Sequence, residues 1–164
     1  MKRLLIAATF AMVVVCGCGG VNPRVATRLN DAATLSGTLP GKPLAGRVIT
    51  SWIDKSDAQH PTMSTLFGND AAVGFARSNS GHEYPVGSVL SLVTWGQQED
   101  ERWFGGNIPA GVRSVEMVAV KSGPDGKAAY EYRRFEGSPL KDVGTQSAGD
   151  RVTFLLVQRA AVMP

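Results

Sequence analysis

The chain has 164 residues, 43% of them hydrophobic, and a formal net charge of +3. No run of Lys and Arg is longer than the pair Arg133-Arg134, so the chain lacks the Lys/Arg footprint of a nucleic-acid-binding protein. Both of its cysteines lie within the first twenty residues. The remainder therefore has no disulfide available and must be stabilised by core burial alone.

Residues 1–17 have the pattern of a secretory signal peptide. A basic start at Lys2 and Arg3 precedes an apolar run from Leu4 to Val15 that only Thr9 interrupts. Signal peptides carry a positive flank and an apolar stretch of roughly 7–15 residues. A membrane-spanning helix needs roughly 20 apolar residues, more than this run contains. We therefore expect export.

The sequence around Cys18 resembles a lipobox, the cleavage and acylation motif of bacterial lipoproteins. Val15, Cys16 and Gly17 precede the cysteine that would be lipidated. Cleavage before Cys18 leaves a small residue at the scissile bond, whereas cleavage before Cys16 would leave Val15 there. The alternative is a plain signal peptide with two incidental cysteines. The motif predicts a lipid anchor on Cys18 and attachment to a membrane.

Cleavage before Cys18 would leave 147 residues with a net charge of +1, because Lys2 and Arg3 are removed. That length suits a single domain. Residues 18–43 are rich in Gly, Asn, Pro, Ser and Thr and are predicted to form a tether, with a short helix around residues 26–33. The folded domain is expected over residues 44–164. By resemblance to other lipoproteins, Gly19 after the lipidated cysteine favours the periplasmic side of the outer membrane.

Strands dominate the expected domain. Residues 47–53 and 62–67 are rich in β-branched and aromatic residues, as pleated surfaces favour, and the turn at His60-Pro61 between them predicts a hairpin. Residues 89–95 are almost wholly apolar, which predicts a central strand. Further strands are expected over residues 112–120 and 128–135, joined by a turn at residues 122–126.

Two helices are expected in addition. Asn69 can cap the first, in which Ala72, Phe75 and Ala76 share one face. Asp150 can cap the second, near the end of the chain. The predicted fold class is α+β, with an antiparallel β-sheet of about five strands and two or three packed helices.

Several short motifs, in their order and spacing, resemble the cytochrome P-460 family. They lie between about Leu44 and Gly137. They are Gly68-Asn69-Asp70 at a helix start, Tyr84-Pro85-Val86-Gly87-Ser88-Val89-Leu90, a strand ending at Trp95, the strand from Val112 to Val118, and the strand from Tyr130 to Gly137. The resemblance implies a largely antiparallel β fold, a homodimer, and relatives that bind small nitrogen species at a covalently attached haem.

The residues that attach haem in this family are missing. No cysteine follows Cys18 and no histidine follows His82, so the family's Cys-x-x-Cys-His motif is absent. Leu92 stands near the place where some relatives carry a lysine crosslinked to the porphyrin. The resemblance therefore implies the fold without covalent haem, and no cofactor is predicted.

His60 and His82 are the only histidines, and both lie in polar, turn-like sequence. Neutral imidazole could ligate a metal or a non-covalently bound haem. Surface histidines without a ligand are the alternative. Two histidines with no cysteine nearby do not complete a zinc site of the usual composition.

The segment after the predicted central strand is the other candidate site. Its residues could form a pocket with aromatic walls and polar groups, or else divide into core aromatics and a solvated acidic turn. The candidates are Trp95, Gln97, Glu99, Arg102, Trp103 and Phe104.

Three functions remain open on these observations. The first is a membrane-tethered domain that binds a small apolar ligand or a protein partner without catalysis. The second is a non-covalent haem protein that handles hydroxylamine or nitric oxide in electron transfer, with His60, His82 or a methionine at the iron. The third is an enzyme that uses the loop from Gln97 to Arg102. No nucleophile elbow or phosphate-binding glycine loop supports the third.

Overall fold

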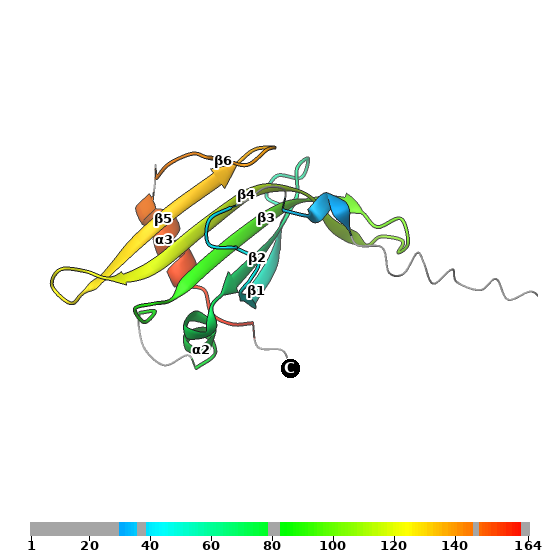
Figure 1. The fold of residues 1–164 in the computed structure, drawn as a ribbon. Helices are drawn as coiled ribbons and strands as arrows, with labels where there is room; N and C mark the ends of the chain where they lie inside the picture. Colours follow the sequence, from blue (N-terminus) through cyan, green and yellow to red (C-terminus); the bar gives the residue numbers. More distant parts are fainter. Residues whose placement is uncertain (1–29, 36–38, 79–82, 146–147, 162–164) are drawn as a thin grey trace, which may run out of the picture.

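A computed structural model of the chain describes residues 30–35, 39–78, 83–145 and 148–161. The predicted signal segment, Cys18, most of the predicted tether and His82 lie outside these residues. The described strands form one antiparallel sheet in simple chain order (Figure 1). They are β1 (Arg47–Asp54), β2 (Thr62–Gly68), β3 (Val89–Glu99), β4 (Asn107–Ser122), β5 (Ala128–Glu136) and β6 (Lys141–Asp142).

The α+β class and the antiparallel sheet are confirmed, but the sheet has six strands where about five were expected. The additional strand, β6, is only two residues long and pairs with the end of β5. So short a segment carries no alternating pattern that sequence could reveal. β3 and β4 also extend beyond their expected ends, to Glu99 and back to Asn107.

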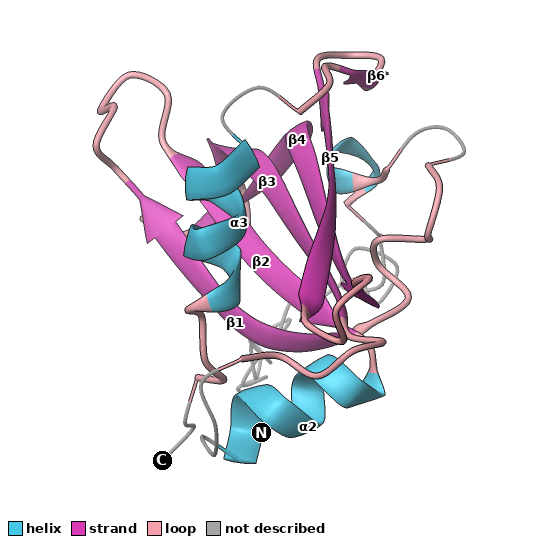
Figure 2. Cartoon of the chain, turned by 90° about the vertical axis from the view of Figure 1, so that its left-hand side faces the viewer, coloured by secondary structure: helices cyan, strands magenta, loops and turns pink. Residues whose placement is uncertain are grey.

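In the described part of the chain, two α-helices accompany the sheet. In α2 (Asp70–Ser78), Ala72, Val73 and Ala76 are buried against the sheet. Asn69 caps this helix as expected, because its Oδ1 accepts the backbone N–H of Ala72 at 3.1 Å. Figure 2 shows α2 at one end of the sheet and the second helix, α3, on one face.

The helix α3 (Ala148–Leu156) buries Val152 and Leu155 on that face of the sheet. The core between them is apolar and includes Leu66, Leu90 and Val118, none of which is exposed. An amphipathic helix over the apolar half of a sheet is the layer arrangement expected for this class.

The opposite face of the sheet has a smaller core, built from Val93, Trp95, Val115 and Phe135. Ala33, Leu35 and Leu39 pack against it, and the short 3-10 helix η1 (Asp31–Ala33) belongs to this covering segment. The segment was expected to be part of the tether. Ala33, Leu35 and Leu39, which lie within the expected tether, pack against apolar sheet surface that would otherwise face water.

Candidate functional site

The face of the sheet under α3 changes from apolar to polar along the strands. Cross-strand partners lie side by side on one face, so the strand register defines rows across the sheet. One row is apolar and contains Leu90, Val118 and Tyr132. The next row is mixed, and the third is polar apart from its tryptophan. The mixed row is Leu66, Leu92, Glu116 and Arg134, and the third is Trp52, Ser64, Thr94, Ser114 and Glu136.

A buried carboxylate lies in the mixed row. Glu116 on β4 is only 3% exposed. Arg151 of α3 donates to both of its oxygens, from Nη2 at 2.7 Å and from Nε at 2.9 Å. The Tyr132 hydroxyl on β5 donates a third hydrogen bond at 2.7 Å. A bidentate Arg–carboxylate pair is strong and directional, so Glu116 fixes how α3 sits on the sheet.

The contacts of Glu116 keep it ionised. Burial alone would raise the pKa of this carboxyl group, but the hydrogen bonds from Arg151 and Tyr132 and the charges of Arg151 and Arg134 outweigh it and lower the pKa. Burial and the same hydrogen bond raise the pKa of Tyr132 to about 12. The hydrogen bond to Glu116 holds the pKa of Arg151 above its usual value. At neutral pH the network therefore contains an anion, a cation and a neutral phenol.

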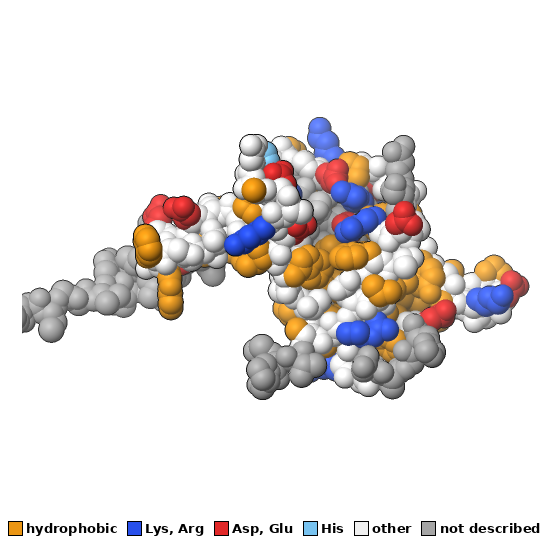
Figure 3. Space-filling view, turned by 180° about the vertical axis from the view of Figure 1, so that it is seen from behind, with side chains coloured by type: hydrophobic (Ala, Val, Ile, Leu, Met, Phe, Trp, Pro, Cys, Tyr) orange, Lys and Arg blue, Asp and Glu red, His pale blue; other side chains and the backbone are white. Residues whose placement is uncertain are grey.

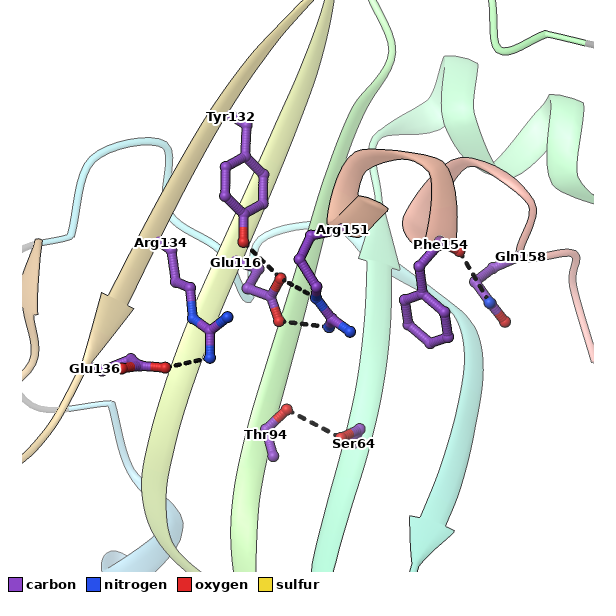
Figure 4. A network of polar contacts seen from close by, with 9 residues as sticks. All are labelled: Ser64, Thr94, Glu116, Tyr132, Arg134, Glu136, Arg151, Phe154 and Gln158. Atoms are coloured by element: carbon purple, nitrogen blue, oxygen red, sulfur yellow. Dashed lines mark hydrogen bonds and ion pairs between the residues drawn. The ribbon is translucent and has the colours of Figure 1, made fainter. Parts of the chain in front are cut away.

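A second guanidinium lies on the other side of Glu116. Figure 4 shows Glu116 between Arg151 and Arg134, with Arg134 turned toward Glu136. Arg134 donates to Glu136 through Nη2, while its Nε is buried and has no hydrogen-bond partner among the described residues. The side chains of Arg134 and Arg151, hereafter the arginine pair, are 32% and 33% exposed. The unpartnered N–H of Arg134 Nε is one of the few buried polar groups without a protein partner in the described part of the chain.

Hydroxyl and aromatic groups adjoin the arginine pair. Ser64 and Thr94 share a hydrogen bond of 3.0 Å across β2 and β3. Trp52 of β1 contacts Phe154 of α3 edge-on, with ring centroids 5.9 Å apart. The Arg151 guanidinium lies 4.7 Å from the centroid of the Phe154 ring. The site therefore joins charged donors, hydroxyl groups and an apolar edge on one face.

Figure 3 shows this side of the molecule, where acidic and basic side chains gather beside an apolar area. The formal charges of Arg134 and Arg151 balance those of Glu116 and Glu136. Such a surface suits a ligand with one anionic group and an apolar body better than a polyanion.

Ser64 bonds to Thr94, and no described histidine takes part in any hydrogen bond of this face. Nowhere in the described part of the chain do three or more His, Cys, Asp or Glu residues group as metal ligands would. The arrangement can bind and orient a polar group.

The six residues of the predicted pocket do not come together in one place. Trp95 is 8% exposed and belongs to the smaller core, where its Nε1 donates to the carbonyl oxygen of Ala33 at 2.9 Å. Gln97 lines a cleft of about 340 Å³ together with Arg113. Glu99, Arg102, Trp103 and Phe104 lie at or near the end of the β3–β4 hairpin and are exposed.

His60 lies in the β1–β2 turn, far along the sheet from α2. Its ring Nδ1 is 2.9 Å from Oδ2 of Asp57, in an exposed turn. The described contacts of this histidine thus hold a turn together. His82 lies outside the described residues.

The buried network was missed as a site. Its signal was present, since Glu116 interrupts an apolar strand at a position that alternates inward with Val118 and Val120. A charged residue at an inward position needs a partner. The partner, Arg151, is thirty-five positions away on a helix, so sequence spacing could not identify it.

No protein-family model and no curated protein matches the chain. The likeness to cytochrome P-460 therefore stays a prediction. Among the described residues, none of the helices has both the length and the apolar character needed to span a bilayer.

Proposed function

We propose that the chain is a lipid-anchored periplasmic binding module with the P-460-like fold but without covalent haem. Its ligand is a small amphiphilic molecule with one anionic group. The observation that carries this proposal is the arginine pair. Two arginine side chains, each about one-third exposed, lie on either side of a buried, ionised Glu116, and one of them has an unsatisfied Nε.

The charged and aromatic groups of the site would contact different parts of the ligand. Glu116 takes both Nε and Nη2 of Arg151, whereas Arg134 gives Nη2 to Glu136 and its side chain is 32% exposed, so we assign the ligand carboxylate to Arg134. Trp52 and Phe154 offer apolar surface for the body of the ligand. Ligand sites commonly combine such an apolar wall with a few placed polar groups.

The test uses 1-anilinonaphthalene-8-sulfonate, an anionic aromatic probe, with octanoate as competitor. We expect saturable binding at one site that octanoate displaces. Arg134→Gln should weaken binding about tenfold or more, because a charge-assisted hydrogen bond contributes roughly 1.5–3 kcal/mol.

Arg133→Gln is the matched control. Arg133 precedes Arg134 on β5, so its side chain points to the other face of the sheet, where it pairs with Asp142 at 3.0 Å. We expect this variant to bind the probe like the wild type. Equal weakening in both variants would contradict the proposed site.

The alternative function, a non-covalent haem protein, is tested by the absorption spectrum of the chain as isolated and after addition of haemin. A stoichiometric Soret band that His60→Ala plus His82→Ala abolishes would replace the proposal with the haem function. Haemin bound through the arginine pair alone would be lost in Arg134→Gln and kept in the histidine variant, which would support an amphiphile site.

A further inference from the structure

The hairpin between β3 and β4 extends beyond the rest of the sheet as a two-stranded arm. The last pair that β2 makes with β3 is Thr62 with Gly96. Gln97 still donates to the carbonyl oxygens of Pro61 and Thr62, but the strand partners of β3 beyond Gly96 are all on β4, in the pairs Gln97–Pro109, Gln98–Ile108 and Glu99–Asn107. Figure 1 shows this arm projecting from the body of the sheet.

The end of the arm exposes two adjacent aromatic side chains. Trp103 is 75% exposed and Phe104 is fully exposed. Figure 3 shows apolar side chains at the end of the projecting arm, with acidic ones beside them. Large apolar groups that stay in water are unfavourable by roughly 1.5–3 kcal/mol each relative to burial, so an exposed pair indicates a contact surface.

The turn that carries these aromatics is built by its own hydrogen bonds. The N–H of Trp103 donates to the carbonyl oxygen of Asp100 at 3.1 Å. The N–H of Gly106 donates to the carbonyl oxygen of Trp103 at 2.8 Å. The Asp100 side chain accepts the N–H of Arg102 at 2.9 Å. The arm therefore presents Trp103 and Phe104 from an ordered turn.

The N-terminal part of the chain joins the domain beside this arm. The side-chain amide of Asn30 donates to the carbonyl oxygen of Pro109 at 2.6 Å, and Pro109 pairs with Gln97 in the arm. Cys18 lies 12 positions before Asn30. A chain of that length spans at most about 40 Å when fully extended, so an anchor on Cys18 would hold the arm near the bilayer.

We propose that Trp103 and Phe104 form a second membrane contact and insert into the interfacial region of the lipid bilayer. The proposal rests on the lipid anchor proposed above. Aromatic rings with a polar edge, above all tryptophan, favour the boundary between headgroups and acyl chains. The anchor raises the effective concentration of lipid at the tip, so a contact that is weak alone becomes populated.

The charges of the tip indicate which lipid it prefers. Glu99, Asp100 and Glu101 outnumber Arg102, so residues 99–104 carry a formal net charge of −2. The contact is therefore driven by apolar burial. Zwitterionic phosphatidylethanolamine and phosphatidylcholine should be favoured, and phosphatidylglycerol should weaken the contact by repulsion.

The experiment measures tryptophan quenching by brominated acyl chains in such vesicles. The full chain is produced in a Gram-negative host and tested alongside Trp103→Phe, which keeps an aromatic ring but removes the fluorophore. The difference between the two isolates Trp103 from Trp52 and Trp95. Flotation of the wild type and of Cys18→Ala with the vesicles reports the lipid anchor separately.

We expect quenching of Trp103 in the wild type. Phe104→Ser should reduce the inserted population about 10- to 100-fold, as expected for the loss of one buried aromatic ring. Val157→Ser is the matched control, because Val157 is also exposed, at 59%, but follows α3 instead of lying in the arm. This variant should be quenched like the wild type.

Wild-type protein that floats with the vesicles but is quenched no more than Trp103→Phe would overturn the second contact and leave the anchor standing. Flotation and Trp103 quenching that are the same in Cys18→Ala as in the wild type would reject the Cys18 anchor and support the lipid contact of the tip. A Trp103 emission shift that follows protein concentration instead of lipid would show a contact between copies and overturn the inference.

Discussion

The ion pair of Glu116 and Arg151 allows a quantitative test of how α3 is held on the sheet. Arg151→Met keeps an unbranched side chain near Phe154 but removes both hydrogen bonds to a carboxylate that is 3% exposed. Breaking a buried pair from one side destabilises by roughly 3–5 kcal/mol. Arg151 is 33% exposed, so solvent screening reduces the expected loss to about 2–3 kcal/mol.

A double-mutant cycle separates the pair from its surroundings. Glu116→Leu leaves the Tyr132 hydroxyl without its acceptor and should destabilise by about 1 kcal/mol, since Arg151 can turn to solvent. The double variant should be about as stable as Glu116→Leu. The coupling free energy from urea unfolding should therefore be about 2 kcal/mol at neutral pH.

The pH dependence of the free energy of unfolding tests the sign of the contribution of Glu116. In the wild type the pKa of Glu116 lies below its usual value, so its stabilisation is complete above that value and is lost as the pH falls through the lowered pKa. In Arg151→Met, burial should raise the pKa of Glu116 instead. The difference in the free energy of unfolding between the wild type and this variant should therefore decrease on acidification, because Glu116 becomes neutral. A coupling below about 0.5 kcal/mol, or a difference independent of pH, would refute this reasoning.

Three further changes test the packing of the fold. Asn69→Ala removes an acceptor that serves two backbone N–H groups and should lower the free energy of unfolding by about 1–2 kcal/mol, whereas Asn69→Asp keeps the acceptor and should lose less in thermal melts. Trp95→Phe removes the hydrogen bond to Ala33. Relative to the wild type, amide exchange should therefore accelerate more in residues 31–35 than in the sheet. Leu155→Ala should destabilise by about 2–4 kcal/mol in urea, while Val157→Ala should change stability by less than about 0.5 kcal/mol. Equal effects of the last two would contradict the burial of Leu155.

The sheet was predictable because its strands satisfy local rules. Residues 47–53, 62–67 and 128–135 lie within the observed β1, β2 and β5, since β-branched and aromatic residues there pack on both faces. The arm was not predictable, because residues 97–99 of β3 pair only with β4 and are polar and partly or fully exposed. Without a buried face, no alternation marks them as a strand.

The site could not be predicted from the sequence because it consists of contacts between distant segments. Glu116 could be recognised as an inward-facing charge, but Tyr132 and Arg151 become its partners only through the β4–β5 register and the position of α3. The packing of Ala33, Leu35 and Leu39 against the smaller core also depends on contacts between distant segments. Nothing local shows that Leu35 and Leu39 complete the core around Trp95.

The buried pair is better explained by positioning than by stability. Hydrophobic residues of similar volume commonly match or exceed the stability of a buried ion pair. Leu92, the sheet neighbour of Glu116, shows that this row accommodates an aliphatic side chain. What an aliphatic pair would not supply is a fixed orientation of the guanidinium beside Phe154 and a charge facing Arg134.

The proposed binding face and the proposed membrane contact are connected by β3. Thr94, in the polar row of the site, lies two residues before Gly96, where the arm leaves the sheet, a separation of about 7 Å along a strand. If the tip of the arm contacts the bilayer, the binding face lies at the base of the arm, and the length of the arm separates it from the lipid. An amphiphile that leaves the bilayer would then reach the arginine pair along the arm, which is consistent with a ligand that has an anionic head and an apolar body.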